Sequence, residues 1–176
     1  MQITAQMVKA LREKTSAGVM DCRNALAKSE GDMDKAVMLL REQGFARLAK
    51  REGHDVSNGV IETYIHGTGR VGGMIEVNCE TDFVAKTPEF KALAHNLVLQ
   101  IVATDPRFIS SNQIPEGTAA HPAEVCILEQ KFIKDESKTI RDIIAETAAK
   151  VGENILVGRF ARFEVGKQAN SETETE

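Results

Sequence analysis

Apolar residues spaced three or four positions apart predict three helices within the first 45 residues. Thr4 is a suitable N-cap for the first helix, and Asp21 and Asp32 are expected to cap the second and third. The third helix is expected to stop at Gly44, because glycine readily takes the left-handed conformation that ends many helices. The apolar positions are Met7, Val8, Leu11, Cys22, Ala25, Leu26, Ala36, Val37, Leu39 and Leu40. Residues 1–45 are therefore expected to form a three-helix bundle.

The apolar pattern changes after this bundle. Residues 46–55 include several basic side chains and are expected to form a helical or extended connector. From Val56 onward apolar and polar residues alternate, first up to His66 and again from Val71 to Asn78. A glycine-rich stretch separates the two runs, as is typical of a turn between neighbouring strands. The alternation therefore predicts a β-hairpin.

The clearest helical pattern in the chain follows Thr87 and Pro88, which suit an N-cap and a first helical position. Apolar residues then mark every turn of one face: Phe90, Leu93, Ala94, Leu97, Val98, Ile101 and Val102. Residues 104–122 contain several prolines and predict a surface loop with at most a short turn of helix.

Two helices and a strand are expected in the remaining part of the chain. The first helix is expected at about 123–132, and the second runs from Thr139 to Gly152. In the strand from Ile155 to Val165, one face is expected to carry Ile155, Val157, Ala161, Phe163 and Val165. This strand is expected to join the hairpin.

The order of these elements predicts an α+β protein, in which a three-helix bundle precedes a three-stranded antiparallel sheet packed with helices. We expect the bundle at 1–45, the connector at 46–55 and the α+β core at 56–166. Residues 167–176 are polar and acidic and are expected to form a disordered tail.

Composition and charge narrow the classes of partner. The 176 residues carry a net charge of −4, so no overall positive field favours nucleic acid or an anionic membrane. No apolar run approaches the roughly 18 residues of a membrane span, and no leader-like segment opens the chain. Three widely spaced cysteines, Cys22, Cys79 and Cys126, indicate a reducing compartment. We expect a cytoplasmic protein that binds a protein partner or a small ligand.

The sequence contains one pattern typical of a nucleotide site. Residues 67–72, Gly-Thr-Gly-Arg-Val-Gly, match the spelling GxGxxG, but a phosphate loop of this kind leads into a helix, whereas a strand follows here. The glycines are better explained by a hairpin turn. Metal-site, P-loop and hydrolase motifs are missing from the sequence, and its four histidines are scattered. We therefore predict no catalytic residue, no metal, no cofactor and no enzymatic activity.

Asp82 and Phe83 form an unusual pair in the short segment between the hairpin and the long helix. In one interpretation Phe83 turns into the core and Asp82 caps a local turn. In the other, the pair protrudes as a wedge that enters a partner. Spacing alone does not choose between them.

Two sequence motifs resemble one known family. Residues 80–85, Glu-Thr-Asp-Phe-Val-Ala, resemble the signature of the elongation factor Ts family, and residues 9–22 resemble its N-terminal motif. The resemblance continues through residues 130–133 and 152–155 to Arg159 and Phe160, and so covers nearly everything before the tail. The N-terminal part is also similar to ubiquitin-associated three-helix domains.

The resemblance implies a guanine nucleotide exchange factor for elongation factor Tu. The bundle would dock on the GTPase domain of Tu, the core would contact another domain, and Asp82 and Phe83 would intrude near the bound magnesium and phosphates. The resemblance thus favours the wedge. The implied partner-binding residues are Leu11, Arg12, Thr15, Gly18, Met20, Asp21, Thr81, Asp82, Phe83 and Val84.

The chain also departs from the longer members of that family. Those members carry a second core subdomain and a protruding helical hairpin, whereas this chain has room for a single core module. Two copies would rebuild the larger core, so we expect a homodimer. Two alternatives stay open: a protein-binding adapter whose bundle recognises another partner, and a nucleotide-binding enzyme that rests on the glycine pattern alone.

Overall fold

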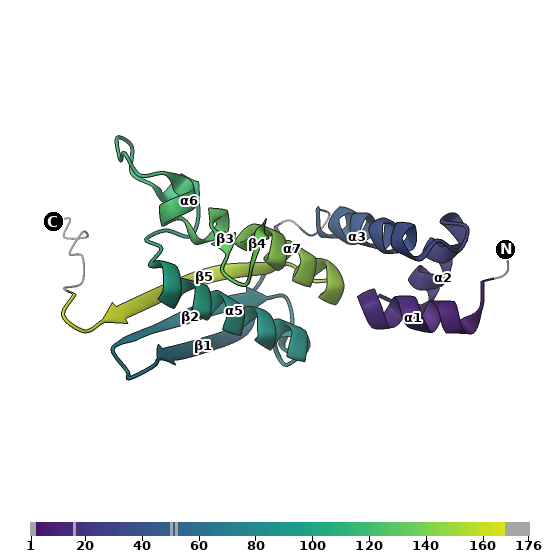
Figure 1. Cartoon of the computed structure of the whole chain (residues 1–176), viewed down its shortest axis with the longest axis horizontal. Coiled ribbons are helices and arrows are strands. Elements are labelled where there is room, and N and C mark those ends of the chain that lie inside the picture. Colours follow the sequence, from purple (N-terminus) through teal and green to yellow (C-terminus); the bar gives the residue numbers. More distant parts are fainter. Residues whose placement is uncertain (1–2, 16, 50, 52, 168–176) are drawn as a thin grey trace.

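The computed structural model describes residues 3–15, 17–49, 51 and 53–167. A helical bundle lies at one end of an elongated molecule and a core of helices and strands lies at the other (Figure 1). This arrangement confirms the predicted α+β class. Residues 50 and 52 of the expected connector and 168–176 of the expected tail lie outside the described residues.

The bundle consists of α1 (Ala5–Thr15), α2 (Val19–Lys28) and α3 (Met33–Ala49), as the apolar spacing predicted. The predicted caps Thr4 and Asp32 each accept a hydrogen bond from the first turn of their helix. Six side chains form the buried centre of the bundle: Leu11, Cys22, Ala25, Leu26, Ala36 and Leu40. The bundle therefore has a small core of its own.

Two predicted helix ends are wrong. α2 begins at Val19 after the extended residue Gly18, so Asp21 lies inside its first turn instead of capping it. An acidic residue is favourable anywhere in a first turn, which is why this pattern resembled a cap. α3 continues past Gly44, where a Cβ atom would lie 2.7 Å from the Cβ of Ala149. Glycine at this position therefore permits close packing of α3 on α7 (Ile140–Val151) instead of ending the helix.

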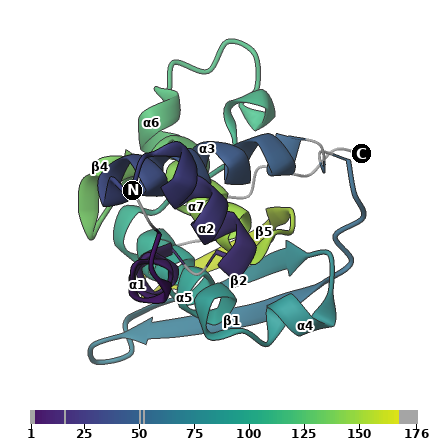
Figure 2. The same ribbon diagram turned by 90° about the vertical axis from the view of Figure 1, so that its right-hand side faces the viewer.

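The core contains the predicted three-stranded antiparallel sheet, with β1 (Asn58–His66), β2 (Val71–Cys79) and β5 (Ile155–Glu164) in the order β1-β2-β5. Helices α5 (Pro88–Thr104) and α7 lie on the same side of this sheet (Figure 2). Thr87 and Pro88 cap and open α5 as predicted. Most of the buried apolar side chains of the core lie between the sheet and these two helices.

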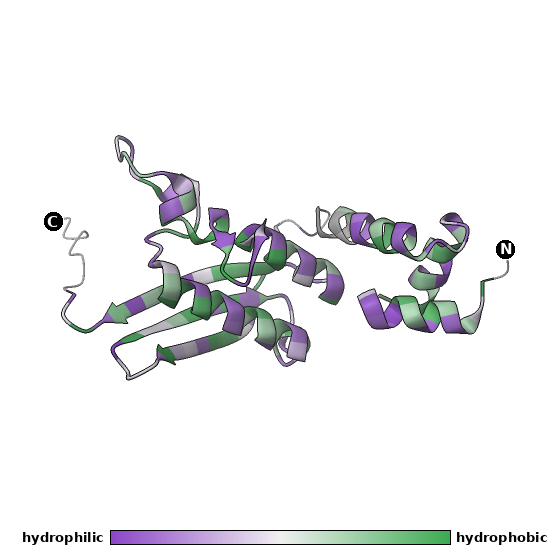
Figure 3. Ribbon diagram, in the orientation of Figure 1, coloured by the Kyte–Doolittle hydropathy of each residue, from purple (hydrophilic) through white to green (hydrophobic). Residues whose placement is uncertain are grey.

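The other face of the sheet is exposed and partly apolar. Ile61 is 61% exposed and Ile65 is 70% exposed, whereas their neighbour Tyr64 packs against the core. Met74, Leu156 and Phe163 lie on the same exposed face, and hydrophobic residues continue to the far end of β5 (Figure 3). No element of the described part of the chain covers this face.

A bulge corrects the prediction for the last strand. Val157 pairs with Val77 and Arg159 pairs with Glu76, so Gly158 is an extra residue in β5. The bulge reverses the alternation: Ile155 and Val157 face the core, but Ala161 and Phe163 face solvent. The predicted single apolar face of this strand is therefore wrong.

The segment between α5 and α7 is mostly irregular. It contains η1 (Ser111–Gln113), α6 (Pro122–Val125), η2 (Ile127–Glu129), β3 (Lys131–Phe132) and β4 (Asp135–Thr139). The predicted loop at 104–122 is confirmed, but the helix expected at about 123–132 is wrong beyond Val125. The buried Gln100 donates hydrogen bonds to Gln130 Oε1 and to the Lys131 carbonyl, which holds residues 130–132 extended after η2.

Candidate partner interface

Phe83 lies on α4 (Asp82–Ala85), a single helical turn between β2 and α5. Thr81 caps this turn by accepting a hydrogen bond from the Val84 N–H at 3.3 Å. Val84 and Ala85 are each 5% exposed and pack in the core, so the opposite side of the turn points outward. Phe83 is consequently 76% exposed. The interpretation in which Phe83 fills the core and Asp82 caps the turn is wrong.

Asp82 lies beside Phe83 on the exposed side of α4. Lys86 Nζ donates to Asp82 Oδ2 at 2.6 Å, and this hydrogen bond lowers the pKa of the Asp82 carboxyl group. Both side chains are about 70% exposed, so the ion pair is a weak surface interaction that another cation can replace. The outward side of α4 thus offers a carboxylate and an aromatic ring next to each other.

Thr81 is exposed beside Asp82 and is part of this surface, whereas the buried Val84 supports it from inside. Glu153, in the turn between α7 and β5, accepts hydrogen bonds from the Thr81 N–H at 3.0 Å and from the Thr81 hydroxyl at 2.6 Å. Glu80, just before Thr81, accepts a hydrogen bond from the Asn154 N–H at 2.7 Å. The motif analysis missed Glu153 as a site residue because it lies 72 positions from Thr81 in the sequence.

The predicted residues of the bundle divide into buried and exposed groups. Leu11 is fully buried, so it supports the bundle from inside, and Thr15 donates a hydrogen bond to the Leu11 carbonyl. Arg12 and Gly18 are exposed, and Met20 is 60% exposed at the start of α2. Sequence reasoning missed Val19, which is 53% exposed beside Met20 and extends the apolar surface there.

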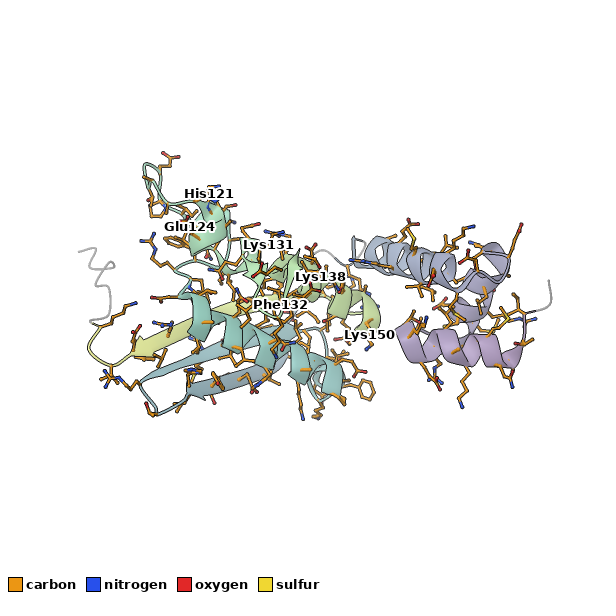
Figure 4. All side chains as sticks on the ribbon, in the orientation of Figure 1. His121, Glu124, Lys131, Phe132, Lys138 and Lys150 are labelled. Atoms are coloured by element: carbon orange, nitrogen blue, oxygen red, sulfur yellow. The ribbon has the colours of Figure 1, made fainter. Side chains whose placement is uncertain are left out.

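A groove of about 860 Å³ lies between the bundle and the core. The predicted residues Thr15, Gly18 and Asp21 line its bundle side, and Gly152 lines its core side next to Glu153. Lys150 also lines the groove, at the end of α7 that faces the bundle (Figure 4). The start of α2 and the support of α4 therefore border the same region of the molecule.

The glycine-rich turn between β1 and β2 has the geometry of a hairpin. Gly67 and Gly69 take positive φ angles of 52° and 81°, and the strands on either side pair antiparallel. This confirms the turn interpretation over the phosphate loop. Within the described residues, no group of three or more histidine, cysteine or acidic side chains is arranged to hold a metal ion, and no helix is long and apolar enough to cross a membrane.

Comparison with known proteins identifies close relatives. The family model described as Elongation factor TS matches residues 1–125 and 118–167. Elongation factor Ts of Moorella thermoacetica is 45% identical to this chain, and the alignment covers 94% of this chain and 96% of that protein. Elongation factor Ts of Carboxydothermus hydrogenoformans is 44% identical, with 94% and 90% covered. Elongation factor Ts of Fervidobacterium nodosum is 41% identical, with 95% and 100% covered.

These alignments also show a difference in length. The alignment with the Moorella protein runs over 195 positions, which is more than the 176 residues of this chain. The relatives therefore contain residues that this chain lacks. The two matched pieces of the family model overlap at 118–125, a stretch that ends with α6.

Proposed function

Because this chain belongs to the elongation factor Ts family, whose members act in translation elongation, we propose that it is the guanine nucleotide exchange factor for elongation factor Tu. In this role it binds Tu with GDP, disturbs the magnesium and phosphate site, promotes GDP release and stays bound until GTP binds. We place this exchange in the cytoplasm, because translation elongation takes place there.

The observation that carries the proposal is the exposure of Phe83 on a turn seated in the core. Val84 and Ala85 anchor α4 from below, so the Phe83 ring extends from a supported base. A ring held in this way loses little further conformational entropy when it enters a partner. Asp82 adds a carboxylate beside the ring, and a carboxylate is a ligand that competes for magnesium.

Exchange of this kind follows from linkage and involves no covalent chemistry. A protein that weakens the binding of GDP to Tu is itself bound less tightly when GDP is present, by the same factor. Accelerating release about 10⁴-fold requires roughly 5.5 kcal/mol of differential stabilisation. Burying one Phe contributes about 1.5 to 3 kcal/mol, so Phe83 alone is not sufficient. The exposed surface around Arg12, Val19 and Met20 is a second source of binding energy.

The exposed sheet face supports the homodimer as part of the same proposal. Two such faces can pack against each other about 10 Å apart, as in a β-sandwich, and would cover Ile61, Ile65 and Phe163.

The dimer is tested by light scattering, which separates the 19.3 kDa chain from twice that mass. Ile65→Glu places a charge on the exposed sheet face and is expected to give the monomer. Met38→Glu changes a side chain that is 63% exposed on the bundle and is the matched control, expected to leave the dimer intact. A wild-type chain that is monomeric at all concentrations contradicts the dimer without affecting the exchange proposal.

The exchange proposal is tested by stopped-flow release of fluorescent GDP from elongation factor Tu. The wild-type chain is expected to accelerate release, and Asp82→Ala and Phe83→Ala are expected to reduce the acceleration. Release that stays at its spontaneous rate with the wild-type chain overturns the proposal. A pull-down that also finds no binding to Tu then favours the adapter, whose bundle recognises a different partner.

A further inference from the structure

Glu80 connects three parts of the chain through one side chain. Its Oε1 accepts a hydrogen bond from the Asn154 N–H at 2.7 Å, in the turn between α7 and β5. Its Oε2 accepts from Arg51 Nη1 at 2.8 Å and lies 3.0 Å from His54 Nδ1, and both partners belong to the expected connector behind the bundle. Glu80 itself directly precedes the cap of α4. This side chain therefore links the connector, the α7–β5 turn and the base of α4.

The environment of Glu80 keeps its carboxyl group ionised. Burial raises the pKa of Glu80, but the hydrogen bonds from the Asn154 N–H, His54 and Arg51 outweigh that effect and lower the pKa to about 2. The side chain is only 12% exposed, so solvent competes weakly for these partners. Hydrogen bonds to a carboxylate that is largely shielded are among the stronger polar interactions in proteins.

Glu153, in the turn between α7 and β5, also binds the segment that begins α4. Its two oxygens accept from the N–H and the hydroxyl of Thr81, and that hydroxyl in turn accepts from the Val84 N–H. The cap that orients α4 is thus held from outside by Glu153. The residue after Glu153, Asn154, donates to Glu80, so the two carboxylates brace α4 through one turn.

The Glu80 side chain is only 12% exposed and Glu153 is half-buried, whereas Thr81, Asp82 and Phe83 form the exposed side of the turn. Replacing either carboxylate by an amide therefore leaves Asp82 and Phe83 themselves unchanged. Val84 and Ala85 still seat α4 in the core without these bonds, so its fold does not depend on them alone. Without the hydrogen bonds of Glu80 and Glu153, the orientation of Phe83 is expected to be less restricted.

We propose that Glu80 and Glu153 are positioning residues for nucleotide exchange, and that the Glu80–Arg51 pair passes binding energy from the docked bundle to Phe83. The inference rests on the proposed exchange function. When the bundle docks on Tu, the position of its connector is fixed relative to Tu. Arg51 and His54 join that connector to Glu80, which directly precedes the cap of α4. A loosely held Phe83 would allow Tu to bind while leaving its nucleotide in place.

The test is stopped-flow GDP release from Tu at increasing concentrations of the full-length chain, which separates the plateau rate from the half-saturating concentration. Glu80→Gln is expected to lower the plateau about tenfold with the half-saturating concentration changed less than about twofold. Glu153→Gln is expected to have a smaller effect of the same kind. The matched control is Glu129→Gln, which removes a carboxylate bound to Arg141 away from α4 and is expected to behave as wild type.

A double-mutant cycle tests the link to the bundle. Arg51→Met keeps Glu80 but removes one partner, and it is expected to lower the plateau about threefold. Since both changes break the same pair, the double variant is expected to be no slower than Glu80→Gln alone. Additive effects of the two changes contradict the transfer of binding energy through this pair.

Amide hydrogen exchange of the free chain tests the positioning of α4 without elongation factor Tu, and so separately from the proposed nucleotide exchange. Glu80→Gln is expected to increase exchange at the Val84 N–H about tenfold relative to Glu129→Gln. Unchanged protection there, or an unchanged plateau while the wild-type chain accelerates release, overturns the positioning role. A wild-type chain that does not accelerate release contradicts the proposed function instead, and the Val84 result then decides alone whether the two carboxylates position α4.

Discussion

Phe83 and Met20 are both exposed apolar side chains near the start of a helix, but the protein holds them in different ways. α4 has only four residues, and an isolated helix shorter than about 12 residues is marginal in water. It exists because Val84 and Ala85 are buried in the core and Glu153 holds its cap. α2 has ten residues and packs within the separate core of the bundle.

From this difference we infer that the two side chains have different roles in the proposed exchange. Phe83 is positioned by packing and hydrogen bonds within the core, whereas Met20 lies on the bundle, which meets the core where α3 packs on α7, at Gly44 and Ala149 and at the ion pair of Arg41 with Glu146. We therefore expect changes around α4 to alter the rate of GDP release and changes at the start of α2 to alter affinity for Tu.

Acid is expected to weaken the hydrogen bonds of Glu80 that support α4. The folded pKa of Glu80, about 2, lies below its ordinary value of 4.5, so its contribution is fully present above that ordinary value and is lost as the pH falls toward 2. The pKa difference corresponds to roughly 3 kcal/mol at most. Urea unfolding at pH 7 and pH 3 is expected to show that the stability gap between wild type and Glu80→Gln shrinks at low pH. An equal gap at both values contradicts this assignment.

Phe83→Ala is expected to separate rate from stability. The plateau rate of GDP release should fall about 30-fold, or about 2 kcal/mol, because this change removes the ring that we propose enters the partner. Since the ring is exposed in the free chain, the free energy of unfolding should change by less than about 0.5 kcal/mol. Phe83→Leu is the graded control and should lie between the two. Stopped-flow release and urea unfolding measure both quantities, and a large loss of stability would show that the ring packs internally.

Val84→Ala is expected to affect both quantities. Removing buried methyl groups beneath α4 should cost about 1.5 kcal/mol of unfolding free energy and also lower the plateau rate. The same two measurements on Val60→Ala, a partly buried valine of β1, provide the control for a general loss of core packing. An equal fall of the plateau rate with Val60→Ala would show that the rate depends on core packing in general and not on the packing of Val84 beneath α4.

Met20→Ala should give the smallest effect and the opposite pattern. The half-saturating concentration in the GDP-release assay is expected to rise about fivefold, or about 1 kcal/mol, while the plateau rate stays unchanged. Met38→Ala removes an equally exposed methionine outside the predicted surface and should change neither. A lower plateau with Met20→Ala would show that the bundle also acts directly on the nucleotide site.

Much of the fold was predictable because its signals are local. The apolar face of α5 and the cap at Thr87 depend on residues within a few positions of one another, and the structure matches both. The hairpin of β1 and β2 follows equally from a period of two and a glycine-rich turn. The family resemblance also rests on short contiguous motifs, and the relatives bear it out.

The errors occurred where a distant residue decides the outcome. Gly44 looks like a helix end, but Ala149 turns it into a packing position. The extra residue Gly158 becomes visible only in the pairing with β2, and it alone exposes Phe163. Residues 130–132 were expected to complete a helix, but the buried Gln100 holds them in an extended form.

By itself, the sequence determined the order of the elements, most of their caps and the family, since each of these depends on neighbouring residues. The tertiary structure alone decided which way Phe83 points. A turn of four residues has no preferred side of its own, so the burial of Val84 and the hydrogen bonds that Thr81 donates to Glu153 set its rotation. Those partners come from strands and turns that are distant in sequence, and only folding brings them to α4.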